Sequence, residues 1–220
     1  MLNLKKYKSL IFDCDGVILN SNKIKTNCFR KIFENYSKEA TDEFIIYHES
    51  NGGISRYIKI RYFLEQILPK YSDKSFLEDF ETLLKLYGVH CTNALRDAQV
   101  AERINELRLH TKKQKWFVVS GSDQGELRGI FKYKNIDTFF DGGIFGSPDI
   151  KTQILKREIK NKSIMLPGLF FGDSWLDHVA AKENKLDFLF VKKWTDFKNY
   201  KHYCQKHSLK IINSIGEIIL

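Results

Sequence analysis

Five short apolar runs, separated by stretches with helical patterns, organise this chain. They lie at residues 9–12, 116–119, 139–146, 169–172 and 186–191. Uninterrupted apolar runs of this length are typical of strands buried on both faces, as in parallel sheets. Strands that alternate with helices predict an α/β core with right-handed parallel connections.

The region between the first two runs is helical in pattern. Apolar residues at helical spacing predict helices near residues 24–33, 56–68 and 76–87; Ser55 suits the N-cap of the second and Pro69 closes it. No convincing strand pattern interrupts this region. We therefore expect a small helical domain inserted after the first strand.

Two links, residues 17–20 and 89–98, are expected to join this insert to the rest of the chain. A helix is expected over residues 100–109, and another over 151–159 follows the third apolar run. Residues 211–220 favour a last edge strand or a short helix.

The charge balance changes which partners we expect. The chain of 220 residues carries a net charge of +9, yet its lysines are scattered and no basic-aromatic stripe or nucleic-acid motif is present. This pattern favours anionic substrates over nucleic acid. The length suits one domain with an insertion or two small domains.

The apolar runs and the cysteines indicate in which cellular compartment the protein is expected. The first apolar run is too short for a signal peptide and is interrupted by Asp13, and no run approaches membrane-spanning length. The cysteines at positions 14, 28, 91 and 204 show no metal-binding or redox spacing, which favours reduced thiols in a cytoplasm.

The first strand ends in a pair of carboxylates, Asp13 and Asp15, followed by Gly16. Side chains two apart on an extended chain point the same way, and the carboxyl end of a strand is where open α/β sheets bind ligands. Such a pair needs a cation or a shared proton to offset its repulsion. A calcium loop is excluded, because Val17 and Ile24 occupy positions that need oxygen ligands.

Polar residues follow the later strands as well. Ser120 and Gly121 lie between a strand and a helix, where a hydroxyl and backbone amides suit a phosphate. Lys151 lies in the first turn of a predicted helix, which is the unfavourable end of the helix dipole for a cation. Its position favours a role in neutralising negative charge, although a lysine that points into water has the same pattern.

Two more carboxylates, Asp173 and Asp177, follow the fourth strand. They suit simple capping of the next helix, or a shared pocket with Asp13 and Asp15 if the fourth strand neighbours the first. Four carboxylates in one pocket would demand a divalent cation.

The insert contains one further candidate, the loop before residue 56. Gly53 and Ser55 precede Arg56, which would lie in the first turn of a helix and gains nothing there from the helix dipole. An anion-contacting role and an ordinary solvated arginine are equally compatible with this pattern.

In order, the stretches DCDGV, VVSGS, GSPDIK and GDSWLD resemble the four motifs of the haloacid dehalogenase superfamily. The resemblance covers the whole chain and is strongest to the C1-capped branch of phosphoglycolate phosphatases and β-phosphoglucomutases. It implies a Rossmann-like core of residues 1–19 and 92–220 with strand order 5-4-1-2-3, and an all-helical cap of residues 20–91. Dehalogenases proper lack the second carboxylate of the first motif, so Asp15 argues against their chemistry. Nothing in the sequence singles out a lysine such as Lys59 for the Schiff base of a phosphonatase.

Carried over by position, the resemblance implies a role for each motif residue. Asp13 is the expected nucleophile and Asp15 the expected general acid and base. The expected Mg²⁺ ligands are Asp13, the backbone carbonyl of Asp15 and Asp173, with Asp177 in support through water or a neighbouring group. The phosphoryl group is expected to bind Ser120, Gly121 and Lys151, and the cap loop with Gly53, Ser55 and Arg56 is expected to reach the substrate.

The implied activity is hydrolysis of a small phosphorylated metabolite by a Mg²⁺-dependent phosphatase. A sugar, polyol or short organic-acid phosphate is the expected substrate, and surface-carbohydrate metabolism is a setting in which similar phosphatases occur. The protein is expected to be a monomer or homodimer. A phosphomutase and an anion-binding module without turnover are the alternatives.

Overall fold

A parallel sheet forms the centre of the structure, a computed structural model that describes residues 3–71 and 79–219. Its strands are β1 (Ser9–Phe12), β2 (Lys115–Asp123), β3 (Gly143–Ser147), β4 (Gly168–Gly172), β5 (Asp187–Val191) and β6 (Lys210–Ile212). They lie in the order β3-β2-β1-β4-β5-β6, and every neighbouring pair is parallel. The expected order 5-4-1-2-3 is confirmed, and β6 extends the sheet by one strand.

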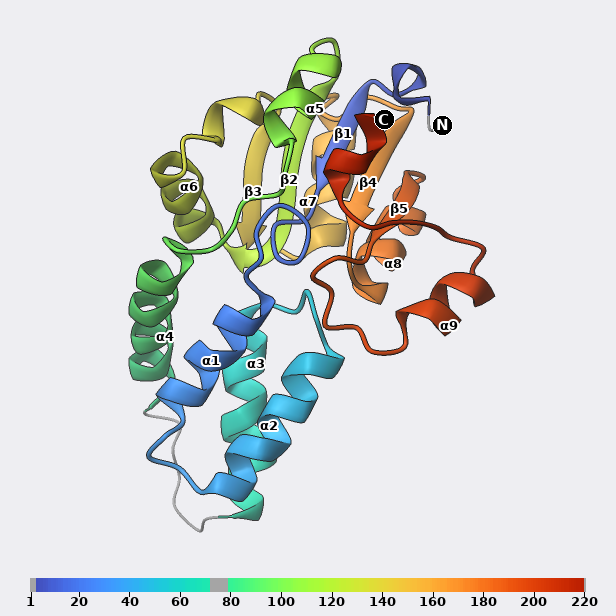
Figure 1. Cartoon of the computed structure of the whole chain (residues 1–220). Helices are drawn as coiled ribbons and strands as arrows, with labels where there is room; N and C mark the ends of the chain where they lie inside the picture. Colours follow the sequence, from blue (N-terminus) through green and yellow to red (C-terminus); the bar gives the residue numbers. More distant parts are fainter. Residues whose placement is uncertain (1–2, 72–78, 220) are drawn as a thin grey trace.

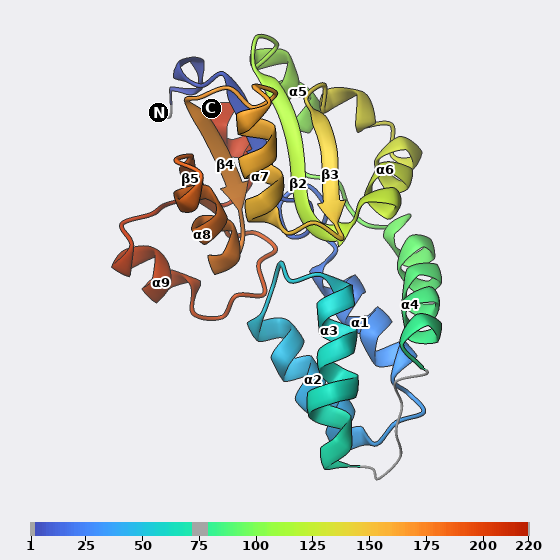
Figure 2. The same ribbon diagram turned by 180° about the vertical axis from the view of Figure 1, so that it is seen from behind.

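Helices cover both faces of this sheet. The core helices are α5 (Ile104–His110), α6 (Gln124–Tyr133), α7 (Lys151–Lys160), α8 (Trp175–Glu183) and α9 (Tyr200–Lys206). Figure 1 shows α5 in front of the sheet, and Figure 2, from behind, shows α7 and α8 over the opposite face. The core is thus the three-layered α/β arrangement that the alternation of strands and helices predicts.

The pleat of β1 divides the core between these two faces. Leu10 and Phe12 pack on the side of α5, whereas Ile11 packs with Ile154 and Ala181 on the side of α7 and α8. All five side chains are buried. Because successive side chains of a strand point to opposite faces, an unbroken apolar run is what a central strand needs.

The insert lies at the carboxyl ends of the strands and is helical throughout its described part. It comprises α1 (Asn22–Ile32), α2 (Lys38–Ser50), α3 (Arg56–Tyr62) and α4 (Phe80–Leu95), with a π-helical turn over Phe63–Ile67 and a 3₁₀ turn over Leu68–Lys70. Figure 1 shows these helices below the sheet as a separate lobe. The start of the expected helix 76–87 lies outside the described residues, and the boundaries of the cap at residues 20 and 91 remain a prediction.

Three expected element boundaries are wrong. The link over residues 89–98 is helical up to Leu95, because Leu83, Tyr87, Cys91 and Leu95 recur every fourth residue and bury one face of α4. Gly88 lies on this helix without ending it.

The third strand starts at Gly143 instead of residue 139. Phe139 ends a 3₁₀ turn, and Phe140 packs its ring against Phe12, with centroids 6.0 Å apart. Phe139 and Phe140 therefore pack in the hydrophobic core and do not form strand hydrogen bonds of β3. Similarly, the helix expected over 100–109 begins only at Ile104.

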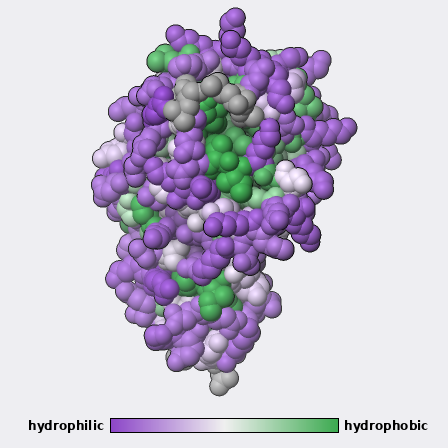
Figure 3. Space-filling model, turned by 45° about the vertical axis from the view of Figure 1, so that its right-hand side comes forward, coloured by the Kyte–Doolittle hydropathy of each residue, from purple (hydrophilic) through white to green (hydrophobic). Residues whose placement is uncertain are grey.

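The surface agrees with a basic, well-solvated protein. Figure 3 shows that the visible face is mostly hydrophilic, with an apolar area confined chiefly to the upper lobe that holds the sheet. Within the described ranges, the helices are all too short or too polar to cross a membrane. The four cysteines are buried and unpaired.

Replacement of Phe12 by alanine tests the packing of the central strand. Its ring stacks on Phe171 at 4.7 Å and lies 4.6 Å from the ring of Trp116. We expect Phe12→Ala to lower the free energy of unfolding by about 3–5 kcal/mol, measured by urea denaturation. Leu109, which is 59% exposed, provides the control, and Leu109→Ala should change it by less than about 0.5 kcal/mol. Equal effects of the two substitutions would contradict this packing.

Candidate active site

The turn after β1 presents two carboxylates in different surroundings. Asp13 is buried, and its Oδ1 accepts a hydrogen bond from the amide of Cys14 at 2.7 Å. Asp15 accepts from the hydroxyls of Ser21 and Ser122 at 2.5 and 2.7 Å and from Nζ of Lys25 at 2.6 Å. The two side chains are thus held by separate partners, so that each can take a separate chemical role.

These partners set the charge of Asp15. Burial acts to raise the pKa of this carboxyl, but Lys25 and the hydroxyls of Ser21 and Ser122 outweigh it and lower the pKa to about 2. The same pairing raises the pKa of Lys25 against the effect of burial. Asp15 and Lys25 therefore form a buried ion pair, and the ammonium also contacts Ser122.

Asp173 and Asp177 follow β4, directly beside β1 in the sheet. Asp177 forms a capping box with Ser174 at the start of α8: its Oδ2 accepts from the Ser174 amide and hydroxyl at 3.1 and 2.6 Å. Oδ2 of Asp173 accepts from the side-chain Nδ2 of Asn22 at 3.0 Å. The predicted pocket shared with the first strand is therefore present, and the capping role of Asp177 is present at the same time.

Lys151 connects the third strand-end loop to this acidic group. It is the first residue of α7, and its Nζ lies 2.8 Å from Oδ2 of Asp13 and 2.5 Å from Oδ1 of Asp177. Burial acts to lower the pKa of this lysine, but the two carboxylates outweigh it and raise the pKa. A lysine at this unfavourable end of a helix is stabilised by the carboxylates it faces.

One lysine does not neutralise three carboxylates. Oxygen atoms of Asp13, Asp173 and Asp177 lie within 4.8 Å of one another, and all three side chains are buried. Burial raises the pKa of Asp13 to about 7, the charges of Asp177 and Asp15 add to this, and Lys151 opposes it. Burial, followed by the charges of Asp177 and Asp13, also raises the pKa of Asp173.

The donor set fits a hard divalent cation such as Mg²⁺, which prefers carboxylate and carbonyl oxygens. Gly16 leaves space for the carboxylate of Asp173: the glycine has φ of +75°, and a Cβ there would lie 2.1 Å from Oδ2 of Asp173. Asp177 already accepts from Lys151 and Ser174, which suits it to orient its neighbours. The expected division between direct ligands and a supporting Asp177 stays a prediction.

The carboxyl-terminal part of β2, which contains Ser120 and Gly121, lies directly against the cap loop. Ser120 is buried, and its hydroxyl accepts from the amide of Ser122 at 3.2 Å. A Cβ at Gly121 would lie 2.1 Å from the carbonyl oxygen of Gly53, so the two backbones are in close contact. Gly53 has φ of +86°, which favours glycine, and its Cβ position is 3.5 Å from Nζ of Lys151. The cap is therefore closed over the strand ends.

Arg56 has a partner on the core in this closed form. Its guanidinium lies 2.6 Å from Oε1 of Glu126 and 4.8 Å from the ring centroid of Tyr87. The side chains of Arg56 and Glu126 are only 8% and 6% exposed. Arg56 lines the pocket, yet its charge is paired with Glu126, so contact with the substrate stays a prediction. Ser55 is at the N-cap position of α3 but makes no capping hydrogen bond.

Among the pocket residues, Lys25 and His48 were not predicted from the sequence, whereas Lys59 was one of the cap cations that favour a polar or anionic ligand. Lys25 follows Ser21 by four residues, a spacing that places both on one face of α1 toward Asp15. Lys59 lies on the face of α3 that also holds Ile60 and Phe63, and all three are buried. The sequence signal for Lys59 was a lysine at a position where the helical pattern predicts an apolar residue. Nothing in the sequence pattern indicated His48.

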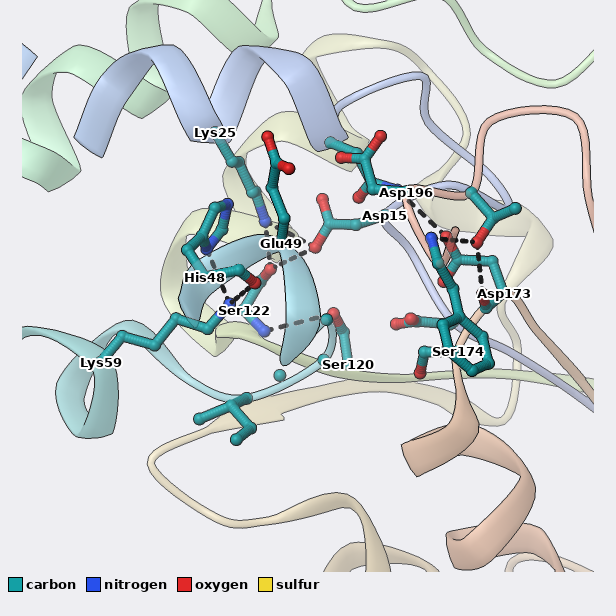
Figure 4. Close-up of a pocket in the computed structure, with 18 of the residues that line it drawn as sticks. Asp15, Lys25, His48, Glu49, Lys59, Ser120, Ser122, Asp173, Ser174 and Asp196 are labelled. Atoms are coloured by element: carbon teal, nitrogen blue, oxygen red, sulfur yellow. Dashed lines mark hydrogen bonds and ion pairs between the residues drawn. The ribbon is translucent and has the colours of Figure 1, made fainter. Parts of the chain in front are cut away.

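One cavity of about 70 Å³ between the sheet and the cap is lined by Asp13, Asp15 and Asp173 from the core and by Lys25, His48 and Lys59 from the insert. Lys151 and Asp177 do not line it but contact two residues that do, Asp13 and Ser174. Figure 4 shows Asp15, Ser120 and Ser122 near the middle of this cavity, Lys59 and His48 on one side, and Asp173 and Ser174 on the other. Pockets for drug-sized ligands have roughly 300–1,000 Å³. The closed form thus holds only a small group, and a larger ligand requires the cap to move.

The family follows from comparison with known proteins. The model of the haloacid dehalogenase-like hydrolases matches residues 10–191, and the chain therefore belongs to this family. The resemblance drawn from its four motifs is confirmed. No curated protein matches the chain.

Solved structures share the fold over nearly their whole length. A haloacid dehalogenase-like hydrolase from Bacteroides fragilis has a TM-score of 0.74 at 19% identity, covering 97% of this chain and 100% of that one. A predicted phosphoglycolate phosphatase from Haemophilus somnus has a TM-score of 0.77 at 15% identity, covering 99% and 98%. CbbY from Rhodobacter sphaeroides, in complex with phosphate, has a TM-score of 0.71 at 14% identity, covering 96% of each chain. Identities this low show a shared fold alone.

The Arg56–Glu126 pair gives a test of cap closure. Glu126→Gln leaves the buried guanidinium without an opposing charge, and we expect the free energy of unfolding to fall by up to about 3–5 kcal/mol in urea denaturation. The matched control is the exposed Lys38–Asp42 pair, whose side chains are 85% and 43% exposed. Asp42→Asn should leave the urea midpoint unchanged. A Glu126→Gln midpoint equal to that of wild type would show that the pair does not hold the cap.

Proposed function

We propose that this protein is a Mg²⁺-dependent phosphatase that hydrolyses a small phosphorylated metabolite through an aspartyl-phosphate. The contact of Asp13 with Lys151, inside a cluster of carboxylates at the ends of neighbouring strands, is the observation that carries the proposal. A sugar, polyol or short organic-acid phosphate is the substrate class we favour.

Asp13 is the proposed nucleophile. Its oxygen attacks phosphorus, the bond from phosphorus to the ester oxygen breaks, and the alcohol leaves. Lys151 holds the carboxylate in place and offers positive charge to the phosphoryl oxygens, and the Ser120 hydroxyl and Gly121 amide are suited to donate to the same oxygens. The site supports this because Lys151 is buried against Asp13.

Asp13, Asp173 and the backbone carbonyl of Asp15 would hold the metal, with Asp177 in support. Bound Mg²⁺ supplies positive charge that offsets the repulsion between an anionic nucleophile and an anionic phosphate. Lys151 contributes to the same balance through its contacts with Asp13 and Asp177.

Asp15 is the proposed general acid and base. In the closed structure it is ionised, which is the form that takes a proton from the water attacking the phosphoenzyme. To protonate the leaving alcohol it must first gain a proton, so its contact with Lys25 has to weaken when the substrate binds. Lys25 belongs to α1 of the insert, and cap movement therefore provides the means.

Cap movement is part of the proposal. The contact of Gly53 with Gly121 closes the site and excludes water, and substrate enters when the insert, proposed as residues 20–91, moves away. Ser55 and Arg56 move with it, which brings Arg56 within reach of the substrate if Glu126 releases it. We place the reaction in the cytoplasm, with surface-carbohydrate metabolism as the proposed setting and a monomer or homodimer as the active form.

Replacement of the nucleophile tests the mechanism. With Mg²⁺ and a panel of phosphomonoesters, Asp13→Asn should lower the release of inorganic phosphate by at least about 10⁴-fold, because a neutral amide cannot form the acyl-phosphate. Asp97, an exposed aspartate, is the matched control, and Asp97→Asn should keep full activity. Turnover by Asp13→Asn at the wild-type rate would reject the mechanism.

Removal of metal is an independent test. We expect EDTA to abolish phosphate release and excess Mg²⁺ to restore it, with the circular dichroism of the protein unchanged throughout. Full activity in EDTA would contradict a metal-dependent reaction.

Steady phosphate release without a bisphosphate primer separates the phosphatase from a phosphomutase.

A further inference from the structure

Lys59 is a buried lysine whose role the proposed chemistry leaves open. It extends from α3 into the pocket and is only 3% exposed. Its Nζ donates to Nδ1 of His48 at 2.7 Å and lies 3.3 Å from the His48 carbonyl oxygen. An ammonium has three donors, so one donor remains for the pocket.

The hydrogen bonds of His48 identify which partner donates. The Thr26 hydroxyl donates to the carbonyl oxygen of Asn22 at 3.1 Å, so it accepts from Nε2 of His48, also at 3.1 Å. Nδ1 is then the acceptor, and the ring is neutral. Burial and the charges of Lys59 and Lys25 lower the pKa of His48 and act in the same direction. His48 therefore orients the Lys59 amine and does not neutralise its charge.

The other cations in or beside the pocket each pair with a carboxylate. Lys25 pairs with Asp15, Lys151 pairs with Asp13, and Arg56 pairs with Glu126. Among the described residues, no carboxylate lies within ion-pair distance of Lys59. Burial, and then the charge of Lys25, lowers the pKa of Lys59 to about 7, while the more distant Asp15 and Asp196 act in the opposite direction.

A buried ammonium without a counter-charge is costly, and an incoming anion would offset that cost. The position of Lys59 separates this anion from the transferred phosphoryl group. Figure 4 shows Lys59 and His48 on the opposite side of the pocket from Asp173 and Ser174. The phosphoryl group already has its own cation, Lys151, beside Asp13.

We propose that Lys59, oriented by His48, forms a subsite for a second anionic group of the substrate, either a carboxylate or a second phosphate. This inference rests on the proposed function and narrows it from phosphomonoesters in general to those with a second negative charge. Lys59 is a specificity-determining residue in this account, and His48 is its positioning residue.

Matched substrates test the subsite in the full-length protein with Mg²⁺. One pair is 3-phosphoglycerate and glycerol 3-phosphate, which differ in a carboxylate; the other is the bisphosphate and the monophosphate of 1,3-propanediol. We expect kcat/KM of wild type to be at least tenfold higher for the anionic member of one pair, and the pair identifies the group. A wild-type ratio of one or less in both pairs would overturn the subsite without any variant.

Variants of Lys59 test whether this residue causes the preference for a substrate with a second anionic group. Lys59→Met should bring the ratio close to one, mainly through KM, whereas Lys59→Arg keeps the charge and should keep the preference. Lys85→Met removes a charge from the exposed surface of α4 and should leave the ratio unchanged. An unchanged ratio in Lys59→Met, or an equal loss in Lys85→Met, would assign the preference to the net charge of the protein and overturn the proposal.

Failure of the proposed function gives a different result. If wild type releases no phosphate from any compound, the phosphatase proposal is wrong, and the same pairs are then compared as ligands by thermal shift. Greater stabilisation by the anionic member, lost in Lys59→Met and kept in Lys59→Arg, supports the subsite. Equal stabilisation by both members overturns it.

Discussion

The balance of charge around Asp13 is the constraint on which the rest of the site depends. Oxygen atoms of three buried carboxylates lie within 4.8 Å of one another, and one buried lysine contacts two of them. That arrangement is unfavourable without more positive charge. In the proposed function, a divalent cation would supply this charge, and Lys151 would attract an anionic substrate. A bound cation would therefore serve both stability and catalysis, because it would offset the repulsion among the buried carboxylates of Asp13, Asp173 and Asp177.

The cap turns this charged edge into a closed site. Lys25 reaches from α1 to Asp15, Arg56 reaches from α3 to Glu126, and Gly53 rests on Gly121. Each contact joins the insert to a strand-end loop of the core or to the helix after it. In the closed structure Lys25 keeps the pKa of Asp15 low, and in the proposed mechanism cap opening and the protonation of Asp15 are therefore coupled.

The strand-end residues were predictable because of a simple geometric rule. Parallel strands end at one edge, so Asp13, Lys151 and Asp173 had to meet once the strand order was known. The contacts of the cap were not predictable in this way. Arg56 meets Glu126 and Lys59 meets His48 only because of how α2 and α3 pack, and helical periodicity alone does not give that packing. The predicted start of the third strand at residue 139 was wrong for a related reason, since Phe140 packs against Phe12 and does not join the strand.

Chemical trapping of the phosphoenzyme tests the central claim most directly. Enzyme mixed with a turned-over phosphomonoester and Mg²⁺ is quenched in acid within the first turnover and reduced with borohydride, which converts an aspartyl-phosphate to homoserine. Peptide mass spectrometry should find homoserine at position 13 and at no other aspartate. Homoserine at position 173 or 177, or none during active turnover, would contradict the account of Asp13 as the nucleophile.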